Sequence, residues 1–372
     1  MNRRNALQWA GLLSGSAIIK NLSYLDTWEN KLNTWSTSET DNNVRLCFNE
    51  NPYGPSEAMR NAMIEAFDEA YMYPGGSIEE LAALIAEEHG VPVDHIVVTA
   101  GSREGLKAAG ITYAGYGKEV IACSPTYRAL MDYAARFGGY VNSVPLDENL
   151  GYDLPEIEKR ISNHTGLVFL CNPNNPTGTL LDGNAVKAFC RRVAQETMVF
   201  ADEVYYDYIS EPGYPSMIEL VKEGLNVIVA RTFSKIYGLA GARVGYLVAR
   251  PEIAKRLNLN LQASSNNIAC RAAIAAIKEK SFFDFSLQKN NEAREYVYNL
   301  CDQLSLKYKK SHANFVFFHT GIDIDNLIPK MAAEGVLVGR PFPPLTDWCR
   351  ISTGKMEEME AFGAALKKVL AG

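Results

Sequence analysis

Residue types that can do covalent chemistry gather around one lysine. Lys235 follows an apolar run, and the segment Arg231–Arg243 around it also contains Ser234. A lysine surrounded by apolar residues in a crevice has a lowered pKa, so its amine can form a Schiff base with an aldehyde. Ser234 and Arg243 can both reach an anion. The segment therefore predicts carbonyl chemistry beside an anion-binding site.

Three more segments supply polar groups. Thr99–Gly105 combines glycines with the expected start of a helix, where backbone N–H groups and the helix dipole favour a phosphate. Cys171–Gly178 contains three Asn, two Pro and a Gly, which indicates a rigid loop that presents several amides. Ala201–Tyr205 places Asp202 at the end of an apolar run, where a partly desolvated carboxylate needs a cationic partner.

The elements that must position these residues alternate along the chain. From Val44 onward, helical patterns cover Ser56–Tyr71 and Ser77–His89. Six β-rich runs separated by helical stretches follow, at His95–Thr99, Glu119–Cys123, Tyr140–Val144, Gly166–Leu170, Met198–Ala201 and Asn226–Ala230. This alternation predicts a mainly parallel sheet with helices on both faces. Ligands bind at the carboxyl ends of such strands, where the four polar segments fall.

The C-terminal part has a different pattern. Residues 266–304 read as mostly helical, and the tail predicts a strand at Asn314–His319, a helix at Asp323–Glu334, a strand at Trp348–Ser352 and a helix at Lys355–Leu370. We therefore predict a large cofactor-binding domain over residues 44–265. Connecting helices and a smaller α+β domain are expected over residues 266–372, and the segment near 44–60 is expected to be shared with the small domain.

One cofactor suits this combination of groups. Pyridoxal phosphate offers an aldehyde for Lys235, a pyridinium nitrogen for Asp202 and a phosphate for the glycine-rich cradle. The chain lacks CxxC, HExxH and paired-His spacings, so no metal site is expected. The seven cysteines are scattered and read as small core residues.

The same segments resemble those of the class I and II aminotransferases of fold type I, and within them the histidinol-phosphate aminotransferases. The motifs occur in family order over roughly residues 44–370. They are FNENPYGPS (48–56), YPGGS (73–77), AGSREG (100–105), SPTY (124–127), CNPNNPTG (171–178), ADEVYYDY (201–208), TFSKIYGLAGARVGY (232–246) and CRISTG (349–354).

The resemblance implies roles at the cofactor. Lys235 would bind it covalently and then act as the base that moves the substrate proton, and Asp202 would pair with the pyridinium nitrogen. Tyr205 and Asn175 would hydrogen-bond the ring oxygen, and Tyr127 would stack on the ring. The phosphate would be held by Ser102, Arg103, Ser234 and Arg243.

The resemblance also implies substrate and partner contacts. Arg350 would hold the substrate α-carboxylate with its planar fork, and Tyr53 and Arg340 resemble substrate-side residues of the subgroup. Tyr73 would reach the cofactor phosphate of a neighbouring subunit, which implies a homodimer with shared active sites. The expected reaction is transamination between an L-amino acid or amino-phosphate and a 2-oxo acid. Glu104 and Glu203 are expected to cap or pair locally.

Two departures leave the substrate open. Arg103 stands where the family usually has a small acidic or amide residue, and the segment Gly339–Leu345 is unusually rich in proline. An aromatic or other neutral amino acid is therefore an alternative donor. A decarboxylase resembling the threonine-phosphate decarboxylases is an alternative reaction, because both reactions use these motifs. A cofactor-binding regulator without activity fits less well, since Lys235, Asp202 and Arg350 are all present.

Residues 1–43 read as a targeting segment and linker. Arg3 and Arg4 precede an apolar run from Ala6 to Ile19, which is too short to cross a membrane and suits a signal peptide. The paired arginines resemble a twin-arginine export signal, although Ala6 and Gln8 depart from its pattern. We therefore expect export to the periplasm, with a cytoplasmic enzyme as the alternative.

Composition excludes several other classes. Hydrophobic residues make up 47% and charged residues 22% of the chain, as in an ordinary globular protein, which argues against disorder, collagen and coiled coil. The net charge of −6 argues against a general nucleic-acid binder, which would present a basic face. A local cationic pocket for a small anion remains compatible with this charge.

Overall fold

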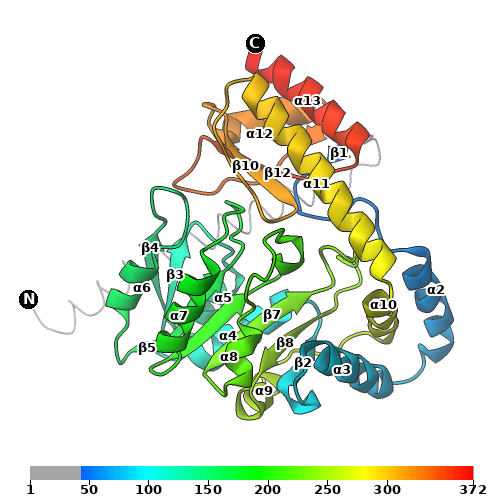
Figure 1. Cartoon of the computed structure of the whole chain (residues 1–372), viewed down its shortest axis with the longest axis vertical. Coiled ribbons are helices and arrows are strands. Elements are labelled where there is room, and N and C mark those ends of the chain that lie inside the picture. The colour runs from blue at the N-terminus through cyan, green and yellow to red at the C-terminus, as the bar shows by residue number, and fades with distance from the viewer. Residues whose placement is uncertain (1–42, 372) are drawn as a thin grey trace, which may run out of the picture. The chain divides into compact units, whose positions relative to one another are not determined.

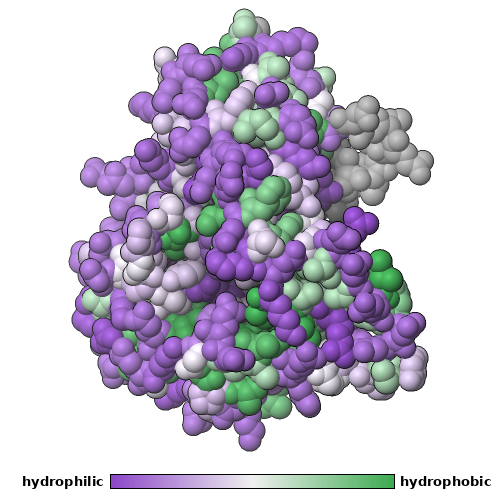
Figure 2. All heavy atoms as spheres, turned by 45° about the vertical axis from the view of Figure 1, so that its right-hand side comes forward, coloured by the Kyte–Doolittle hydropathy of each residue, from purple (hydrophilic) through white to green (hydrophobic). Residues whose placement is uncertain are grey.

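The computed structural model describes residues 43–371, and the predicted twin-arginine signal and most of the predicted linker lie outside this range. Figure 1 shows two sheets with their covering helices, and Figure 2 shows the hydropathy of the residues on one side of the molecule. The longer helices are α2 (Glu57–Glu65), α3 (Gly75–His89), α4 (Ser102–Ala114), α5 (Ala129–Arg136), α6 (Leu154–Arg160), α7 (Gly183–Val193), α9 (Pro251–Asn258), α10 (Asn267–Lys278), α11 (Lys280–Gln303), α12 (Ile324–Ala333) and α13 (Met356–Ala371). Shorter ones are α8 (Ile218–Lys222), η1 (Ala66–Glu69), η2 (Val93–His95) and η3 (Tyr206–Tyr208).

The large sheet has seven strands in the order β2-β8-β7-β6-β5-β3-β4. These are β2 (Ile96–Thr99), β8 (Gly245–Ala249), β7 (Val227–Thr232), β6 (Met198–Asp202), β5 (Thr165–Cys171), β3 (Glu119–Ser124) and β4 (Tyr140–Pro145). The five strands from β7 to β4 are parallel to their neighbours, whereas β8 is antiparallel to both β7 and β2. The predicted mainly parallel α/β sheet is confirmed.

Strand β8 was not among the predicted strands. The loop over residues 233–244 joins β7 to β8 without a helix, and a strand that returns without a crossover must run antiparallel. That loop contains Lys235 and Arg243, and its sequence indicates a chemical motif without indicating the strand that follows it. The antiparallel return brings both residues back to the same end of the sheet.

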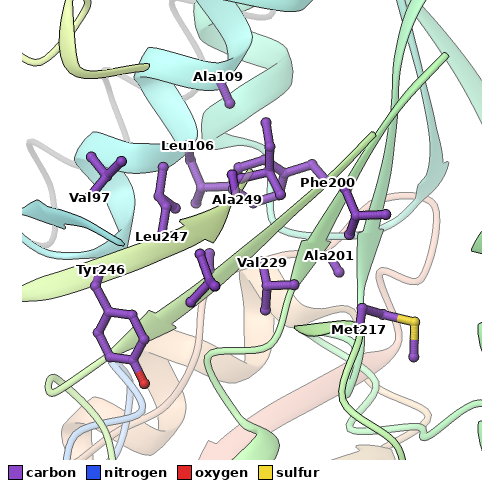
Figure 3. Close-up of a cluster of buried hydrophobic side chains, with 14 of the residues drawn as sticks. Val97, Leu106, Ala109, Phe200, Ala201, Met217, Val229, Tyr246, Leu247 and Ala249 are labelled. Carbon is purple, nitrogen blue, oxygen red and sulfur yellow. The ribbon is translucent and has the colours of Figure 1, made fainter. Parts of the chain in front are cut away.

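Burial on both faces explains the apolar strands. Every residue of β6, β7 and β8 is buried, and such strands read as continuous apolar runs. Helices α6, α7 and α8 lie in front of the sheet in Figure 1, and α4 and α5 lie behind it. Figure 3 shows Leu106 and Ala109 of α4 close to Leu247 and Ala249 of β8.

The C-terminal part forms a second, antiparallel sheet, as predicted for the smaller α+β region. Its order is β12-β10-β9, with β12 (Trp348–Ser352), β10 (Phe315–His319) and β9 (Tyr308–Lys309). Helix α11 contacts β10 and α13, and α12 contacts α13. Strand β1 (Val44–Arg45) pairs in parallel with β11 (Val336–Leu337), so the start of the described chain lies against its C-terminal part. The domain boundary at residue 265 stays a prediction.

Most observed element boundaries lie within two residues of those predicted from the sequence. The helix predicted over Ser56–Tyr71 is shorter, because α2 ends at Glu65 and continues as the 3-10 helix η1 to Glu69. Helix α3 begins at Gly75, directly after Pro74, and ends at His89, followed by Gly90, whose φ of +60° suits a glycine cap. Within residues 43–371, no helix is long and apolar enough to span a membrane.

Candidate active site

Lys235 lies in the loop after β7 with its amine held by a backbone carbonyl. The Nζ atom donates to the carbonyl oxygen of Asn49 over 2.8 Å. The lysine pKa is lowered from its usual 10.5 to about 8, chiefly by burial and also by the charges of Arg350 and Arg243, against the opposing effects of Glu50 and Asp202. About a tenth of the amine is therefore neutral, and able to act as nucleophile or base, at pH 7, far more than for an ordinary lysine.

Asp202 ends β6 and is 1% exposed. Its Oδ1 atom has no hydrogen-bond partner among the described residues. Burial raises the pKa of this carboxyl to about 7, although a hydrogen bond from the Val204 backbone and the charge of Lys235 oppose the rise. A buried acceptor without a donor is costly, so this oxygen is poised to accept a hydrogen bond from a cationic N–H group of a ligand.

Three side chains form a connected set beside Lys235. Asn175 donates from Nδ2 to the Tyr205 hydroxyl oxygen over 3.3 Å, and its Oδ1 accepts from Nη1 of Arg350 over 2.7 Å. Nη2 of Arg350 donates to the Cys47 carbonyl oxygen over 2.7 Å, while its buried Nε has no partner. Tyr205, Asn175 and Arg350 are each under 8% exposed. The loop after β5, the turn after β6 and strand β12 thus meet at one point.

An anion cradle forms at the start of α4. Gly101 precedes this helix with a φ of +79°, and a Cβ there would lie 2.3 Å from Nη2 of Arg243. Only glycine therefore lets the guanidinium approach the turn. Arg243 donates from Nη1 to the hydroxyl of Ser234 over 3.2 Å, and Ser102 is the first residue of α4. A helix N-terminus, two hydroxyls and an arginine together suit a phosphate.

Tyr127 lies among the predicted site residues. It is partly buried against the large core, and burial raises the pKa of its phenol. The charges of Arg103, Asp202, Arg340 and Arg243 all act on that phenol. Arg103 itself is exposed on the first turn of α4. The stacking role of Tyr127 and the phosphate contact of Arg103 stay predictions.

Arg340 and Arg350 share one aromatic ring. The guanidinium carbons lie 4.3 Å and 5.0 Å from the ring centroid of Phe342, which is 2% exposed. Burial lowers the pKa of Arg340 to about 10, and the charge of Arg350 contributes. No ion pair joins either arginine to a carboxylate within residues 43–371. Two cations that form no ion pair in the described chain thus lie near Tyr127 and Asn175, and the charge of Asp132 acts on Arg340 without a direct contact.

The structure does not bring Tyr53 and Tyr73 to this group. The Tyr53 ring packs edge-on against Phe285 of α11, with centroids 5.0 Å apart, and lines a small pocket with Asn290 and Asn314. Tyr73 is 99% exposed. Neither ring contacts Lys235 in this chain, so their predicted contacts with substrate and cofactor stay predictions.

The two acidic residues set aside in the sequence have the local roles expected. Glu104 accepts hydrogen bonds from the backbone N–H groups of Ala100, over 2.7 Å, and Gln262, over 3.0 Å. Glu203 forms a buried ion pair with Arg231 over 2.9 Å. All seven cysteines are buried and unpaired, as expected of core residues.

Sequence reasoning assigned no role to Asn49 or Phe342. Asn49 donates from Nδ2 to the Tyr205 hydroxyl over 2.9 Å and accepts from Lys235. It lies in the motif FNENPYGPS, whose polar residues after an apolar run could have marked it. Phe342 lies in the proline-rich segment, where only its position two residues after Arg340 could have drawn attention.

Pyridoxal phosphate fits the arrangement of these residues. Asp202 presents the orphan acceptor that a pyridinium N–H would fill, and the cradle at Gly101 would hold the phosphate. When bound, the cofactor supplies an electrophilic aldehyde and a ring that withdraws electrons from the substrate Cα. Tyr205 and Asn175 would bind the ring oxygen, and Arg350 would hold the substrate anion. The Lys235 amine, freed of its proton, would be the base that moves the Cα proton.

Comparisons with known proteins agree with this geometry. Residues 41–366 match the family described as aminotransferase class I and II. The histidinol-phosphate aminotransferase of Moorella thermoacetica is 37% identical over 88% of this chain and 86% of its own length, and that of Caldicellulosiruptor saccharolyticus is 34% identical over 88% and 92%.

Solved structures give the same result. A putative histidinol-phosphate aminotransferase from Erwinia carotovora is 32% identical with a TM-score of 0.85, covering 88% of this chain and 96% of that one. The histidinol-phosphate aminotransferase of Sinorhizobium meliloti, solved with pyridoxal-5′-phosphate, is 27% identical with a TM-score of 0.82, covering 88% and 90%. The protein belongs to the class I and II aminotransferases and is a pyridoxal-phosphate-dependent enzyme of fold type I.

Proposed function

We propose that this aminotransferase acts on a phosphorylated amino alcohol of the histidinol phosphate type and passes its amino group to a 2-oxo acid. The observation that carries the proposal is the pair Arg340 and Arg350, which flank Phe342 without a carboxylate partner in the described chain. A buried and a half-buried cation beside the same ring favour a ligand that carries two negative charges. A phosphate dianion and a dicarboxylic 2-oxo acid both meet that requirement.

The similarity to histidinol-phosphate aminotransferases supports the same substrate class. A neutral aromatic amino acid has one carboxylate, which Arg350 alone could bind, and it would leave the Arg340 charge uncompensated. The two donors therefore differ in their dependence on Arg340.

An assay panel with a matched pair of variants tests the substrate. Histidinol phosphate and phenylalanine are each supplied with 2-oxoglutarate, and amino transfer and carbon dioxide release are both measured. Arg340→Gln should lower kcat/KM for histidinol phosphate about 10- to 100-fold, as for the loss of a charge-assisted contact, and leave phenylalanine little changed. Arg128→Gln is the control, because Arg128 already pairs with Asp132 over 3.0 Å. A parent enzyme that prefers phenylalanine, or releases carbon dioxide, would overturn the proposal.

We also propose a homodimer with shared active sites. Large apolar side chains are exposed on α2, η1 and the following loop, namely Ile64, Phe67, Tyr71, Met72 and Tyr73, at 48–99% exposure. Apolar surface of this kind favours a protein partner. A second copy that covered these residues could carry Tyr73 to its neighbour's cofactor phosphate.

Subunit complementation tests the shared site. Tyr73→Ala and Lys235→Ala are purified separately, mixed in equal amounts and allowed to exchange subunits. In a mixed dimer one site combines the intact Lys235 of one subunit with the intact Tyr73 of the other. About a quarter of the parent activity should therefore return if sites are shared across a two-fold axis. A mixture that stays inactive while sedimentation shows mixed dimers would contradict the shared site.

We propose, finally, that the enzyme is exported to the periplasm. The support is Arg3 and Arg4 before the apolar run, which lie outside the described residues, and a twin-arginine route would carry a folded, cofactor-loaded protein. Cell fractionation of the native chain, and of the chain with Arg3→Lys and Arg4→Lys, tests this. Export predicts a periplasmic native chain and a retained variant, whereas both forms in the cytoplasm would refute it.

A further inference from the structure

One short segment of the chain contacts three of the groups expected to act on substrate and cofactor, namely Arg350, Lys235 and Tyr205. The Cys47 carbonyl accepts from Arg350, and the Asn49 carbonyl accepts from Lys235. Asn51 anchors the segment, because its Nδ2 donates to the Ile236 carbonyl over 2.8 Å. Residues 47–51 therefore lie beside the base and the anion-binding arginine.

Asn49 has an unusual conformation within this segment. Its φ is +57°, in the left-handed region that asparagine adopts more readily than most residues, and it is 2% exposed. This turn lets the carbonyl face Lys235 while the side-chain amide faces Tyr205.

Ser352 on β12 fixes which way that amide points. The Asn49 backbone N–H donates to the Ser352 hydroxyl oxygen over 2.8 Å, and this hydroxyl donates to Oδ1 of Asn49 over 3.2 Å. With Oδ1 engaged as an acceptor, the NH2 group must face Tyr205, to whose hydroxyl oxygen it donates over 2.9 Å.

Asn175 approaches the same phenol oxygen from another side. Its Oδ1 accepts from Arg350, which can only donate, so its NH2 group also faces Tyr205. The Tyr205 oxygen thus accepts two hydrogen bonds, which occupy both of its lone pairs. Its own O–H has no acceptor among residues 43–371 and is left to donate to a bound ligand.

We propose that Asn49 is a positioning residue of the reaction: its amide turns the Tyr205 hydroxyl hydrogen toward the cofactor ring oxygen, and its carbonyl holds the Lys235 amine in place. Asn49 contacts Tyr205, Lys235 and Ser352, and it would act through the first two. The inference depends on the cofactor and is independent of which amino donor the enzyme uses.

Two substitutions separate the two contacts. Asn49→Gly keeps the left-handed backbone and the carbonyl at Lys235 but removes the amide from Tyr205. Asn49→Asp keeps the shape but replaces the donor by an ionised acceptor, which would take the Tyr205 hydrogen and add negative charge beside Lys235. Ser305→Gly is the matched control, because Ser305 is exposed and also has a positive φ, of +55°.

Three quantities are measured for each variant: the cofactor dissociation constant by titration of the apoenzyme, the pH midpoint of the visible absorption band of the holoenzyme, and turnover with any donor that the parent accepts. We expect Asn49→Gly to weaken cofactor binding about tenfold with the pH midpoint nearly unchanged. We expect Asn49→Asp to raise the midpoint by about one unit and to lower turnover about 100-fold. Ser305→Gly should match the parent in all three.

The outcomes decide the proposal in each case. Parent-like cofactor affinity in Asn49→Gly overturns the role of the amide, and this variant decides alone if Asn49→Asp fails to fold. A folded Asn49→Asp with the midpoint of Asn49→Gly overturns the link to Lys235. Failure of histidinol phosphate as a donor leaves both tests intact, because neither uses that substrate.

Discussion

Two consecutive carboxylates at the end of β6 have opposite surroundings. Glu203 is fully engaged: it accepts from Arg231 over 2.9 Å, from the Ser216 hydroxyl over 2.8 Å and from the Met217 backbone over 2.7 Å. Asp202, one residue earlier and equally buried, has an oxygen without any partner in the described chain. Since neighbouring side chains point to opposite faces of a strand, the two acids serve different sides of the sheet.

The difference separates a structural acid from a functional one. Arg231, below Glu203, also pairs with Asp207 over 3.3 Å and lies 3.8 Å from the ring centroid of Tyr206. Such a satisfied network can stay buried without a ligand. The unsatisfied oxygen of Asp202 is stable only at a cost, and a bound pyridinium N–H would remove that cost. Of these two acids, the one with the unpaired oxygen is therefore the better candidate for a cofactor contact.

The largest effect is expected when the functional acid is removed. Asp202→Ala should lower turnover at least about 1,000-fold, because the ring loses the carboxylate that keeps its nitrogen protonated. Some cofactor should remain bound, since the contacts of Ser234 and Arg243 with the phosphate are intact. Single-turnover kinetics and cofactor absorbance measure the two effects. Turnover within a few-fold of the parent would remove the distinction between the two acids.

Removing the structural acid should affect stability instead. Glu203→Gln leaves the buried Arg231 with Asp207 as its one carboxylate partner in the described chain, which should lower the free energy of unfolding by about 3 kcal/mol. Turnover per folded molecule should stay within a few-fold of the parent. Denaturant unfolding and active-site titration check both. A stable but inactive variant would mean that Glu203 takes part in the chemistry.

Sequence patterns predicted the parts of the site that lie in rigid loops after strands. Lys235, Asp202 and Asn175 all follow apolar strands, and in a parallel sheet the strand ends meet at one edge. The antiparallel strand β8 could not be predicted in this way, because no helix separates it from β7. Predicting the mainly parallel sheet required only the spacing of the apolar runs.

The remaining contacts depend on segments that are far apart in sequence. Asn49 reaches Tyr205 only because β1 pairs with β11 and Ser352 fixes the segment behind it. Such pairings involve only a few residues and leave no periodicity in the sequence. The position of Tyr53 against Phe285 depends in the same way on how α11 packs.

A smaller effect is expected from a substitution of Arg350, whose buried Nε has no hydrogen-bond partner in the described chain. Arg350→Lys should raise KM for amino and oxo acids alike, about 10- to 100-fold, because lysine cannot reproduce the planar fork that bridges Asn175 and an anion. Position 350 keeps a positive charge near Lys235 in this variant. Steady-state kinetics of both half-reactions measure the effect, and unchanged KM values would place the substrate anion elsewhere.

The smallest expected effect is a shift in pH dependence. Because the Lys235 pKa is lowered from 10.5 to about 8, its amine loses its proton as the pH rises through about 8. The rate of cofactor loading into the apoenzyme should therefore rise with pH, about tenfold per unit below this midpoint, and level off above it. Arg350 contributes to the lowering, so Arg350→Gln should move the midpoint upward, whereas Arg350→Lys, which keeps the charge, should leave it near 8.

In the apoenzyme the lowered pKa of Lys235 also affects stability. The unfolded chain binds more protons than the native one between about pH 8 and 10.5, so this group makes stability rise with pH in that window. Asp202, with its pKa raised from 3.8 to about 7, acts in the opposite direction: the native state binds more protons between those values, and its contribution to stability falls as the pH rises through them. Stopped-flow loading measured from pH 6 to 10 checks the midpoint, and a midpoint above 10 in the parent would mean that burial does not activate the lysine before the cofactor binds.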